Sequence, residues 1–318
     1  MQFIRGISNL KSPDQECVLT LGNFDGIHLG HQIILRNLKE QANLRKLPSA
    51  VLFFEPQPRE FFSRDSSPAR LSSFWEKFSF IRDLGIDILC CLRFSQELAS
   101  MDPADFIETI LIRGLKVRHL IVGDDFCFGK DRQGNFQLLQ DYSRRTGLFT
   151  LEKTPSYTLD GLRISSTLVR QALSANNLTL AYRLLGRPYS ISGKVVHGQQ
   201  LGRSLGFPTA NLQLKRIVCP VKGVYAVLVH LKNRIYQGIA NVGSRPTVRG
   251  VTPLLEVYIF DFNEAIYEER IQVSFLHRLR NEQHFATVDH LKSQLILDKK
   301  SAREYFSSCT SEILSISQ

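Results

Sequence analysis

Two histidines stand at the point in the sequence where chemistry is easiest to recognise. His28 and His31 lie in "LTLGNFDGIHLGHQIIL", where a strand-like run ends near Gly22 and a helix-like run begins close to the histidines. Glycine lets backbone approach a phosphate closely, and a helix N-terminus presents unpaired N–H groups with a partial positive charge. Imidazole N–H groups added there could donate to oxygens that gain charge during phosphoryl or nucleotidyl transfer. An ordinary helix cap uses similar residues, so this stretch alone leaves both interpretations open.

A second candidate anion site lies in "GLRISSTLVRQAL", residues 161–173. Three hydroxyl side chains come just before a helical run, and Arg170 follows about one turn later. Hydroxyl caps, a helix N-terminus and a guanidinium together can bind a polyphosphate. An ordinary serine cap is again the alternative interpretation.

The third candidate lies in the glycine-dense stretch "GKVVHGQQLGRSLGFPTANL", residues 193–212. Thr209 and Asn211 are two residues apart, so their side chains face the same side of an extended segment. Hydroxyl and amide oxygens suit a magnesium ion that is shared with phosphates, although a glycine-rich turn would look similar. Glu256 interrupts the otherwise apolar run "LLEVYIF", and a carboxylate there could take a proton from an attacking hydroxyl. Asp261 is a weaker candidate for that base.

The first half of the chain alternates strand-like and helix-like segments. The expected strands are residues 17–22, 50–54, 86–94, 118–123 and 148–154. The expected helices are residues 31–47, 72–85, 102–114 and 136–147, the third with Asp102 as its N-cap. Such alternation predicts a parallel sheet with helices on both faces.

The pattern changes at "LLGRPYSISG", residues 184–193. Short strands separated by glycine-rich turns follow, at residues 191–198, 223–231, 234–243, 254–262 and 270–279. Closely spaced antiparallel strands predict a small barrel, against which a helix at residues 287–306 would pack. We therefore place the domain boundary at Gly186, with one domain over residues 1–186 and the other over 187–318.

Charge and composition restrict the class of protein. The 318 residues carry a formal net charge of +10, which favours anionic partners such as nucleotides, although a solvated basic surface would give the same value. No apolar run approaches the roughly 20 residues that a membrane helix needs, and the first residues lack the apolar core of a secretory signal. The six cysteines form no C-x-x-C pair. We expect reduced thiols, no structural disulfide and a cytoplasmic location.

The first-half motifs carry a family resemblance. "GNFDGIHLGH" and "ISSTLVR" resemble the H-x-G-H nucleotidyltransferases, and "FFEPQPREFF" and "VGDDFCFGKDRQGN" resemble the FAD synthetase module of bacterial riboflavin kinase/FAD synthetases. The resemblance implies that ATP binds at the H-x-G-H turn and that the phosphate of FMN attacks its α-phosphorus, giving FAD and pyrophosphate. It gives His28 and His31 the catalytic role. It assigns nucleotide binding to Gly22, Asn23, Phe24, Asp125, Ser165, Ser166, Thr167 and Arg170, and flavin binding to Phe54, Pro56, Pro58 and Phe62. Gln57 stands where many members have histidine.

The second-half motifs "GRSLGFPTANL", "GVYAV", "NVGSRPTV" and "LEVYIFDF" resemble the riboflavin kinase module. The resemblance implies that Glu256 is the general base for the ribityl 5′-hydroxyl and that Thr209 and Asn211 hold Mg²⁺. It assigns nucleotide binding to Gly202, Gly206 and Thr209, and flavin binding to Arg245, Arg280, Glu282 and Phe285. Two residues depart from the pattern: Val248 replaces a common aromatic, and Glu268 replaces a common glycine.

Together these features predict a Rossmann-like nucleotidyltransferase sheet followed by a small antiparallel β-barrel with a C-terminal helix. The expected function is bifunctional: riboflavin is phosphorylated to FMN, and FMN is adenylylated to FAD. The expected small molecules are riboflavin, FMN and ATP with Mg²⁺, and neither nucleic acid nor membrane is an expected partner. One alternative is a relative with a single working site or a changed substrate. Another is a basic nucleic-acid-binding protein, for which no recognition motif is present.

Overall fold

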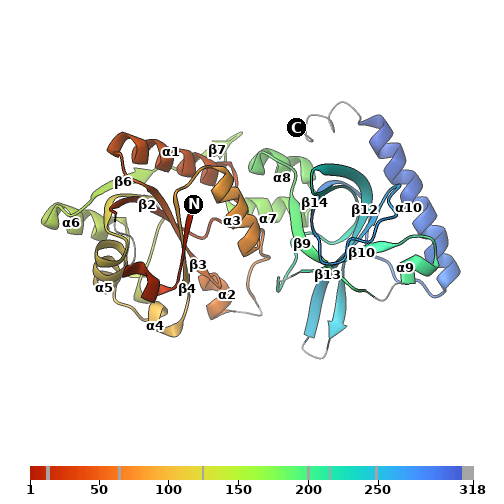
Figure 1. Ribbon diagram of the computed structural model, residues 1–318, viewed down its shortest axis with the longest axis horizontal. Coiled ribbons are helices and arrows are strands. Elements are labelled where there is room, and N and C mark those ends of the chain that lie inside the picture. Colours follow the sequence, from red (N-terminus) through yellow and green to blue (C-terminus); the bar gives the residue numbers. More distant parts are fainter. Residues whose placement is uncertain are drawn as a thin grey trace. The chain divides into compact units, whose positions relative to one another are not determined.

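The computed structural model describes residues 1–11, 15–63, 66–123, 125–198, 201–214, 216–247 and 250–309, and they form two compact units. Unit 1 comprises Met1–Pro68 and Phe74–Ser165, and unit 2 comprises Ala69–Ser73 and Ser166–Gln318. Figure 1 follows the chain through both units by colour. Each unit is described separately below.

Unit 1 is built on a six-stranded sheet with the order β1-β4-β3-β2-β5-β6, and its neighbouring strands pair in parallel. The strands are β1 (Gln2–Arg5), β2 (Cys17–Leu21), β3 (Ser49–Glu55), β4 (Ile88–Arg93), β5 (Val117–Gly123) and β6 (Thr150–Thr154). The α-helices are α1 (Leu29–Arg45), α2 (Pro58–Phe62), α3 (Phe74–Asp83), α4 (Gln96–Ala99), α5 (Pro103–Phe106) and α6 (Phe136–Thr146). A π-helix, η2 (Ile107–Gly114), continues α5, and short 3-10 turns η1 (Ile7–Lys11) and η3 (Lys130–Arg132) and a hairpin β7 (Thr158–Leu159)–β8 (Leu162–Arg163) complete the unit.

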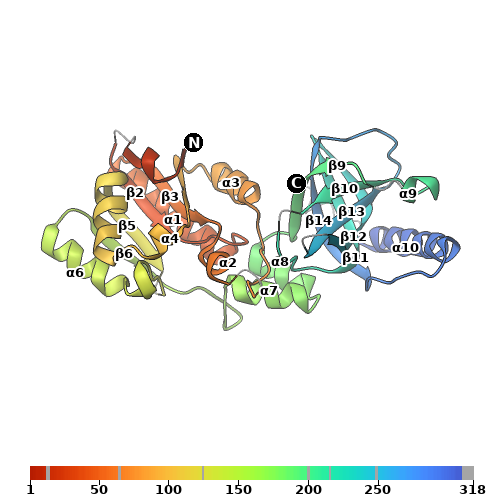
Figure 2. The same cartoon turned by 90° about the horizontal axis from the view of Figure 1, so that it is seen from below.

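Apolar cores cover both faces of this sheet. Figure 2 draws its strands and the helices around them. On one face, α1 and α3 pack Leu35, Leu38 and Ile81 against the sheet. On the other face, the α5–η2 segment and α6 contribute residues such as Ile110 and Leu139. The central strands β2, β3 and β4 are buried on both sides, which explains why they read as continuous apolar runs in the sequence. The predicted parallel sheet with helices on both faces is confirmed, and Asp102 caps α5 by accepting a hydrogen bond from the Ala104 N–H at 2.8 Å.

Unit 2 contains a closed barrel with the strand order β10-β13-β12-β11-β14-β9. The strands are β9 (Ser190–Val196), β10 (Thr209–Gln213), β11 (Gly223–Leu231), β12 (Arg234–Thr247), β13 (Gly250–Ile259) and β14 (Arg270–Arg280), and all six pairings are antiparallel. The helices are α7 (Ser166–Ser174), α8 (Leu178–Leu185), α9 (Leu201–Ser204) and α10 (Val288–Ser308).

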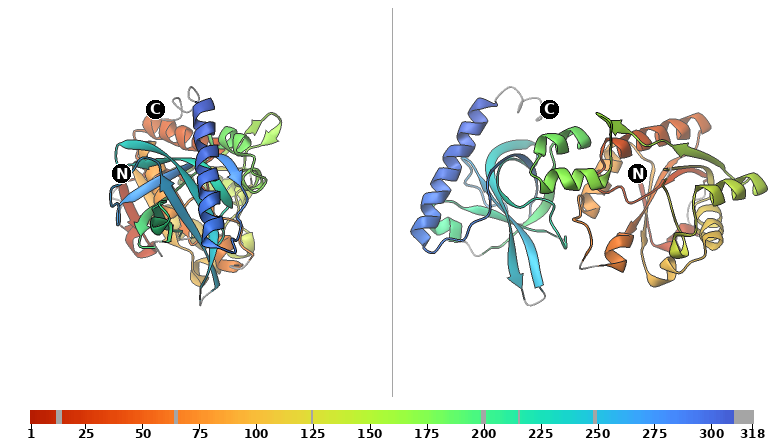
Figure 3. Two further views of the ribbon diagram at one scale, coloured as in Figure 1. Left: turned by 90° about the vertical axis from the view of Figure 1, so that its right-hand side faces the viewer. Right: turned by 180° about the vertical axis from the view of Figure 1, so that it is seen from behind.

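Helix α10 lies along the outside of the barrel, as two views in Figure 3 show. Its residues Ala302 and Phe306 join a core cluster with Val224, Ala226 and Ile239 of the barrel strands. Thr287 caps the helix, because its hydroxyl accepts a hydrogen bond from the His290 N–H. The predicted barrel with a C-terminal helix is confirmed.

Helices α7 and α8 belong to the barrel's compact unit, since α8 packs against β14 and the two helices pack against each other. The compact units therefore part after Ser165, whereas the sequence pattern changes at Gly186. Gly186 itself ends α8 in the left-handed conformation, with a φ of 71°. Over the part of the chain described here, no helix is long and apolar enough to cross a membrane.

Candidate functional sites

The H-x-G-H turn leaves β2 at the centre of the unit 1 sheet. Strand β2 lies between β3 and β5, and the connection from β2 leads to β3 on one side while β5 pairs on the other. This is the position at which strand order reverses, where open α/β sheets bind ligands beyond the carboxyl ends of their strands. The predicted histidines therefore lie where the fold favours a ligand.

His28 is the N-cap of α1, and its Nδ1 accepts a hydrogen bond from the His31 N–H at 3.3 Å. That bond leaves Nε2 of a neutral His28 as the ring donor. The His28 and His31 rings stack with centroids 3.7 Å apart, and the buried Phe24 ring lies 5.1 Å from the His31 ring. The pair is thus both a helix cap and a preformed set of ring donors, so the two interpretations of the sequence are compatible.

The turn before the histidines has strained backbone. Phe24 and Ile27 have φ values of 46° and 39°, and Gly26 has a φ of 82°. For a β-branched residue such as Ile27, positive φ is a genuine outlier that surrounding structure must enforce. Ile27 and Phe24 are buried in the core beside α1, which supplies part of that enforcement.

Burial also determines the protonation of His31. Its Nδ1 is buried without a hydrogen-bond partner. Desolvation lowers the pKa of His31 well below its usual value, and the neighbouring charges of His28 and Lys77 lower it further. The lowered pKa favours the neutral form of His31 at physiological pH.

In unit 1, the segment that begins the second predicted anion site lies near the H-x-G-H turn. A Cβ built on Gly30 would lie 3.8 Å from the carbonyl oxygen of Ile164, so the segment that leads into Ser165 abuts the start of α1. Just upstream, Arg163 forms an ion pair with Asp125, with 2.9 Å between Nη2 and Oδ2. Asp125 follows β5, the strand beside β2.

The remaining residues of that motif belong to unit 2. Ser166 and Thr167 lie in the first turn of α7, and Arg170 lies one turn further on. The guanidinium Nε of Arg170 donates to the Ala69 carbonyl at 2.6 Å. Arg170 therefore has a protein acceptor in this structure.

The predicted flavin residues of unit 1 lie beside an aromatic cluster at the end of β3. Phe54 and Phe62 each contact Phe94, with ring centroids 5.8 and 5.6 Å apart, and Phe61 also packs on Phe94 at 5.3 Å. Phe62 is 65% exposed, so this cluster presents apolar ring surface to solvent. Phe61 and Phe94 were not among the residues predicted from the sequence, although the run "REFF" is aromatic. Pro58 starts α2, where its fixed φ and missing N–H are tolerated.

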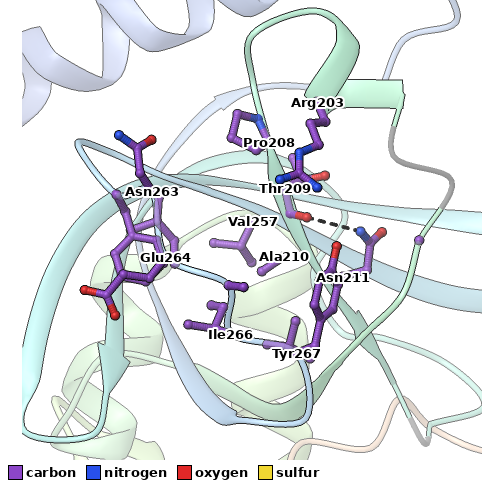
Figure 4. A pocket seen from close by; sticks show the side chains of 15 residues that line it. Arg203, Pro208, Thr209, Ala210, Asn211, Val257, Asn263, Glu264, Ile266 and Tyr267 are labelled. Atoms are coloured by element: carbon purple, nitrogen blue, oxygen red, sulfur yellow. Dashed lines mark hydrogen bonds between the residues drawn. The ribbon is translucent and has the colours of Figure 1, made fainter.

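A cavity of about 320 Å³ in unit 2 contains the predicted Mg²⁺ ligands (Figure 4). Thr209 and Asn211 of β10 line it, and the Asn211 Nδ2 donates to the Thr209 carbonyl at 3.3 Å. The loop between β13 and β14 forms another wall, and Figure 4 shows its residues Asn263 and Glu264 across the cavity from Thr209. This loop was not predicted from the sequence to be part of a site.

The glycines near this cavity permit close backbone packing. The Phe207 N–H donates a hydrogen bond of 2.8 Å to the Gly202 carbonyl and so closes a turn between the two residues. A Cβ at Gly202 would lie 2.4 Å from the Phe207 oxygen and 3.6 Å from the Thr209 hydroxyl. Gly206 has a φ of 85° in the same turn. Both predicted glycines are thus required by the shape of the loop that leads into Thr209.

Glu256 lies between two asparagines. In the barrel register it pairs with Asn211 of β10 on one side and with Asn241 of β12 on the other. Directly opposite residues of antiparallel strands point to the same face, so the three polar side chains form a row. The Oδ1 of Asn241 is buried without a hydrogen-bond partner, and the sequence analysis did not identify this residue.

The oxygen donors of this row fit a hard cation. Thr209 and Asn211 supply neutral oxygens, and Glu256 lies next to Asn211. Within the described residues, no group of three or more His, Cys, Asp or Glu side chains could hold a metal by itself. Oxygen donors of this kind are those that Mg²⁺ prefers when it keeps water and substrate phosphates among its ligands.

The predicted flavin residues of unit 2 have partners within the protein. Arg280 forms an ion pair with Asp298 of α10, with 2.8 Å from Nη2 to Oδ2, and its guanidinium lies 5.7 Å from the Phe285 ring. Glu282 lies 3.4 Å from the Lys222 ammonium. Arg245 pairs with Thr252 in the β12–β13 backbone register, and its side chain and Val248 lie outside the described residues.

The backbone conformation of Glu268 explains why the riboflavin kinase family commonly has glycine at this position. It has a φ of 70°, a conformation that glycine adopts at little cost, and its carboxylate forms an ion pair with Lys194. The preceding Tyr267 lines the cavity, and its ring stacks on His197 with centroids 3.9 Å apart. The substitution therefore leaves the cavity wall in place.

Comparison with known proteins assigns both halves of the chain. Residues 10–168 match a family model described as FAD synthetase, and residues 185–306 match one described as riboflavin kinase. Bifunctional riboflavin kinase/FMN adenylyltransferases from Escherichia coli K12 and Haemophilus influenzae are each 48% identical to this chain. The first match covers 96% of this chain and 98% of the relative, and the second covers 97% and 100%. A solved structure described as a macrolide-efflux protein from Streptococcus pneumoniae is 32% identical with a TM-score of 0.79, covering 95% of this chain and 99% of that one.

Proposed function

This chain belongs to the family of bifunctional riboflavin kinases/FMN adenylyltransferases, and from that premise we propose which residues carry each of its two reactions. The protein phosphorylates riboflavin to FMN with ATP and then adenylylates FMN to FAD with release of pyrophosphate. The observation that supports the division of labour is that His28 and His31 lie beyond the carboxyl end of β2 in the unit 1 sheet, whereas Thr209 and Asn211 line a cavity of unit 2.

In the kinase reaction, Glu256 takes the proton of the ribityl 5′-hydroxyl as that oxygen attacks the γ-phosphorus of ATP, and ADP leaves. Thr209 and Asn211 would hold the Mg²⁺ that balances phosphate charge, and the cavity beside them would take the nucleotide. The strand register that places Glu256 opposite Asn211 and Asn241 supports this assignment, because it places the carboxylate beside a proposed Mg²⁺ ligand. Gly202 and Gly206 shape the loop over the phosphates, and Arg245, Arg280, Glu282 and Phe285 remain the proposed flavin side.

In the adenylyl transfer, an oxygen of the FMN phosphate attacks the α-phosphorus of ATP in line and pyrophosphate leaves. No covalent enzyme intermediate forms. His28 and His31 donate ring N–H groups to phosphate oxygens that gain charge, and the N-terminus of α1 adds its partial positive charge.

The other proposed ATP contacts are Gly22, Asn23, Phe24, Asp125, Ser165, Ser166, Thr167 and Arg170. The proposed flavin side is Phe54, Pro56, Pro58 and Phe62, and the exposed aromatic surface at the end of β3 supports it, because isoalloxazine stacks on such rings.

The functional modules and the compact units divide the chain differently in this proposal. We assign adenylyl transfer to residues 1–186 and the kinase to 187–318, and the riboflavin kinase match that begins at residue 185 supports this boundary. We place the protein in the cytoplasm, and its six cysteines, none of which forms a disulfide, support a reducing compartment.

Two substitutions test the assignment. Glu256→Gln should abolish FMN formation from riboflavin while FAD formation from supplied FMN continues, because only the kinase needs that base. His28→Ala should have the opposite effect. The matched controls are Glu269→Gln, which removes a surface partner of Lys232, and His284→Ala at an exposed position, and both should leave the two rates unchanged. Loss of both activities from a folded Glu256→Gln or His28→Ala protein would show that the two sites are not independent.

A further inference from the structure

Lys77 is a fully buried lysine in unit 1. It lies on α3, and none of the proposed catalytic or binding roles uses it. A charged ammonium is rarely buried unless it is paired, because burial removes it from water. A buried lysine is therefore expected to fix the position of the groups that its ammonium contacts.

The Lys77 ammonium contacts two neighbouring strand ends. Its Nζ lies 3.4 Å from the Asn23 carbonyl oxygen, in the turn after β2, and 3.7 Å from Glu55 Oε2, at the end of β3. It also lies 4.5 Å from the centre of the Phe53 ring, where a cation is attracted to the π face. One side chain thus joins the turn on the nucleotide side to the residue just before Pro56 on the flavin side.

The turn that Lys77 contacts is the strained one. Asn23 immediately precedes Phe24, whose φ is 46°, and Ile27 has a φ of 39° directly before His28. Backbone in this conformation persists only when neighbouring groups hold it. A hydrogen bond from a buried ammonium to the first carbonyl of the turn is such a constraint.

We propose that Lys77 is a positioning residue of the adenylyl-transfer site, which ties the Asn23–Ile27 turn to the end of β3 and so sets where His28 and His31 stand relative to the flavin side. The proposal rests on the proposed function of the two histidines. Lys77 touches neither reactant in this account, and its effect passes through the turn.

The same geometry has an electrostatic consequence for His31. The titratable groups that act on His31 are His28 from its own turn and Lys77 from α3, and Glu55 from β3 faces Lys77. Lys77 contributes to the lowered pKa of His31, after desolvation and His28. Removing the ammonium should therefore raise the pKa of His31 toward its ordinary value, and the acid limb of FAD formation should move to higher pH.

The test compares Lys77→Met, which keeps the length and removes the charge, with Lys77→Arg, which keeps the charge. Lys39→Met is the matched control, because Lys39 also pairs with a carboxylate of unit 1, Asp87, but is partly exposed. The measurements are FAD formation from FMN and ATP across pH, FMN formation from riboflavin in the same preparations, and an NMR titration of the His31 ring.

We expect Lys77→Met to lower kcat for FAD formation by about 100-fold, the loss typical of catalytic groups displaced by about 1 Å. FMN formation should stay within about twofold of the parent, because the kinase residues lie in the other unit. Lys77→Arg should recover part of the lost rate, Lys39→Met should change neither rate, and the His31 titration should move upward only in Lys77→Met.

Unchanged FAD formation and an unchanged His31 titration in Lys77→Met would overturn the proposal. If that variant loses both activities by unfolding, Glu55→Gln decides, because it removes the carboxylate beside Lys77 and leaves the lysine. A selective fall in FAD formation then supports the proposal, and no change refutes it. His28→Ala run in parallel separates the two ideas: if it leaves FAD formation intact, the proposed function itself fails, whatever Lys77 does.

Discussion

The Arg280–Asp298 pair permits a prediction whose size follows from the structure. Arg280 was assigned to the flavin side by the resemblance to the riboflavin kinase module, but its guanidinium makes three hydrogen bonds of 2.8–3.1 Å to the Asp298 carboxylate. The Asp298 side chain is only 3% exposed, and Gln294 donates to it at 2.9 Å. The perturbation we consider is Arg280→Met, which leaves that carboxylate with one weaker partner.

Removing one member of a buried ion pair generally costs about 3–5 kcal/mol, since the remaining charge is buried and unpaired. Here the guanidinium is 17% exposed and Gln294 retains its bond, so we expect the lower end of that range, about 3 kcal/mol. A surface arginine used only for ligand binding would change stability by about 0.5 kcal/mol or less.

The assay is urea denaturation followed by circular dichroism, with hydrogen exchange of β14 and α10 to localise the effect. Arg303→Met is the matched control, because Arg303 lies on α10, as Asp298 does, and contacts the Asp261 carboxylate twice, at 2.8 and 2.9 Å. That pair is exposed, at 45% and 76%, so its loss should cost less than about 1 kcal/mol. Adding Asp298→Leu to Arg280→Met should recover part of the lost stability, because no buried charge is then left alone.

One result would refute the reasoning. If Arg280→Met costs no more than Arg303→Met and instead raises KM for riboflavin alone, the ion pair does not hold α10 on the barrel. Arg280 would then act only on the proposed flavin side, and its contact with Asp298 would not stabilise the barrel.

Two further substitutions test the loops of the kinase site. Gly202→Ala should lower FMN formation and weaken the barrel by about 1–3 kcal/mol, because the new Cβ would meet the Phe207 carbonyl at 2.4 Å; an unchanged kinase KM for ATP would show that this loop does not shape the nucleotide site. Glu268→Gly should be more stable than Glu268→Ala by about 1 kcal/mol in thermal unfolding, because both lose the ion pair and only alanine keeps the strain at a φ of 70°. Equal stabilities of the two would mean that the positive φ carries no cost.

The sequence predicted elements best where the local pattern was unambiguous. Strand β11 spans Gly223–Leu231 as expected, since a buried apolar run lies between a glycine and a hairpin turn. Strand β10, Thr209–Gln213, was not predicted as a strand, because its polar residues point toward the candidate site. The π-helix at Ile107–Gly114 was read as ordinary helix, since its apolar spacing does not distinguish the two.

The residues of the candidate sites also differ in how readily the sequence identifies them. Motif residues such as His28 and Thr209 could be identified because their residue types and spacing are unusual. Lys77 could have been found from its spacing as well, because it shares the apolar stripe of α3 with Phe74, Phe78 and Ile81 at helical intervals. Asn241 gave no local signal, since its place opposite Glu256 depends on strand register, which only the folded barrel defines.

The central claim is that one chain carries out two consecutive reactions. The direct measurement incubates the purified protein with riboflavin, ATP and Mg²⁺ and separates the flavins by chromatography over time. The account predicts that FMN rises first and that FAD follows. FMN without FAD would contradict the adenylyl-transfer assignment of His28 and His31, and no product from riboflavin or from supplied FMN would contradict both assignments.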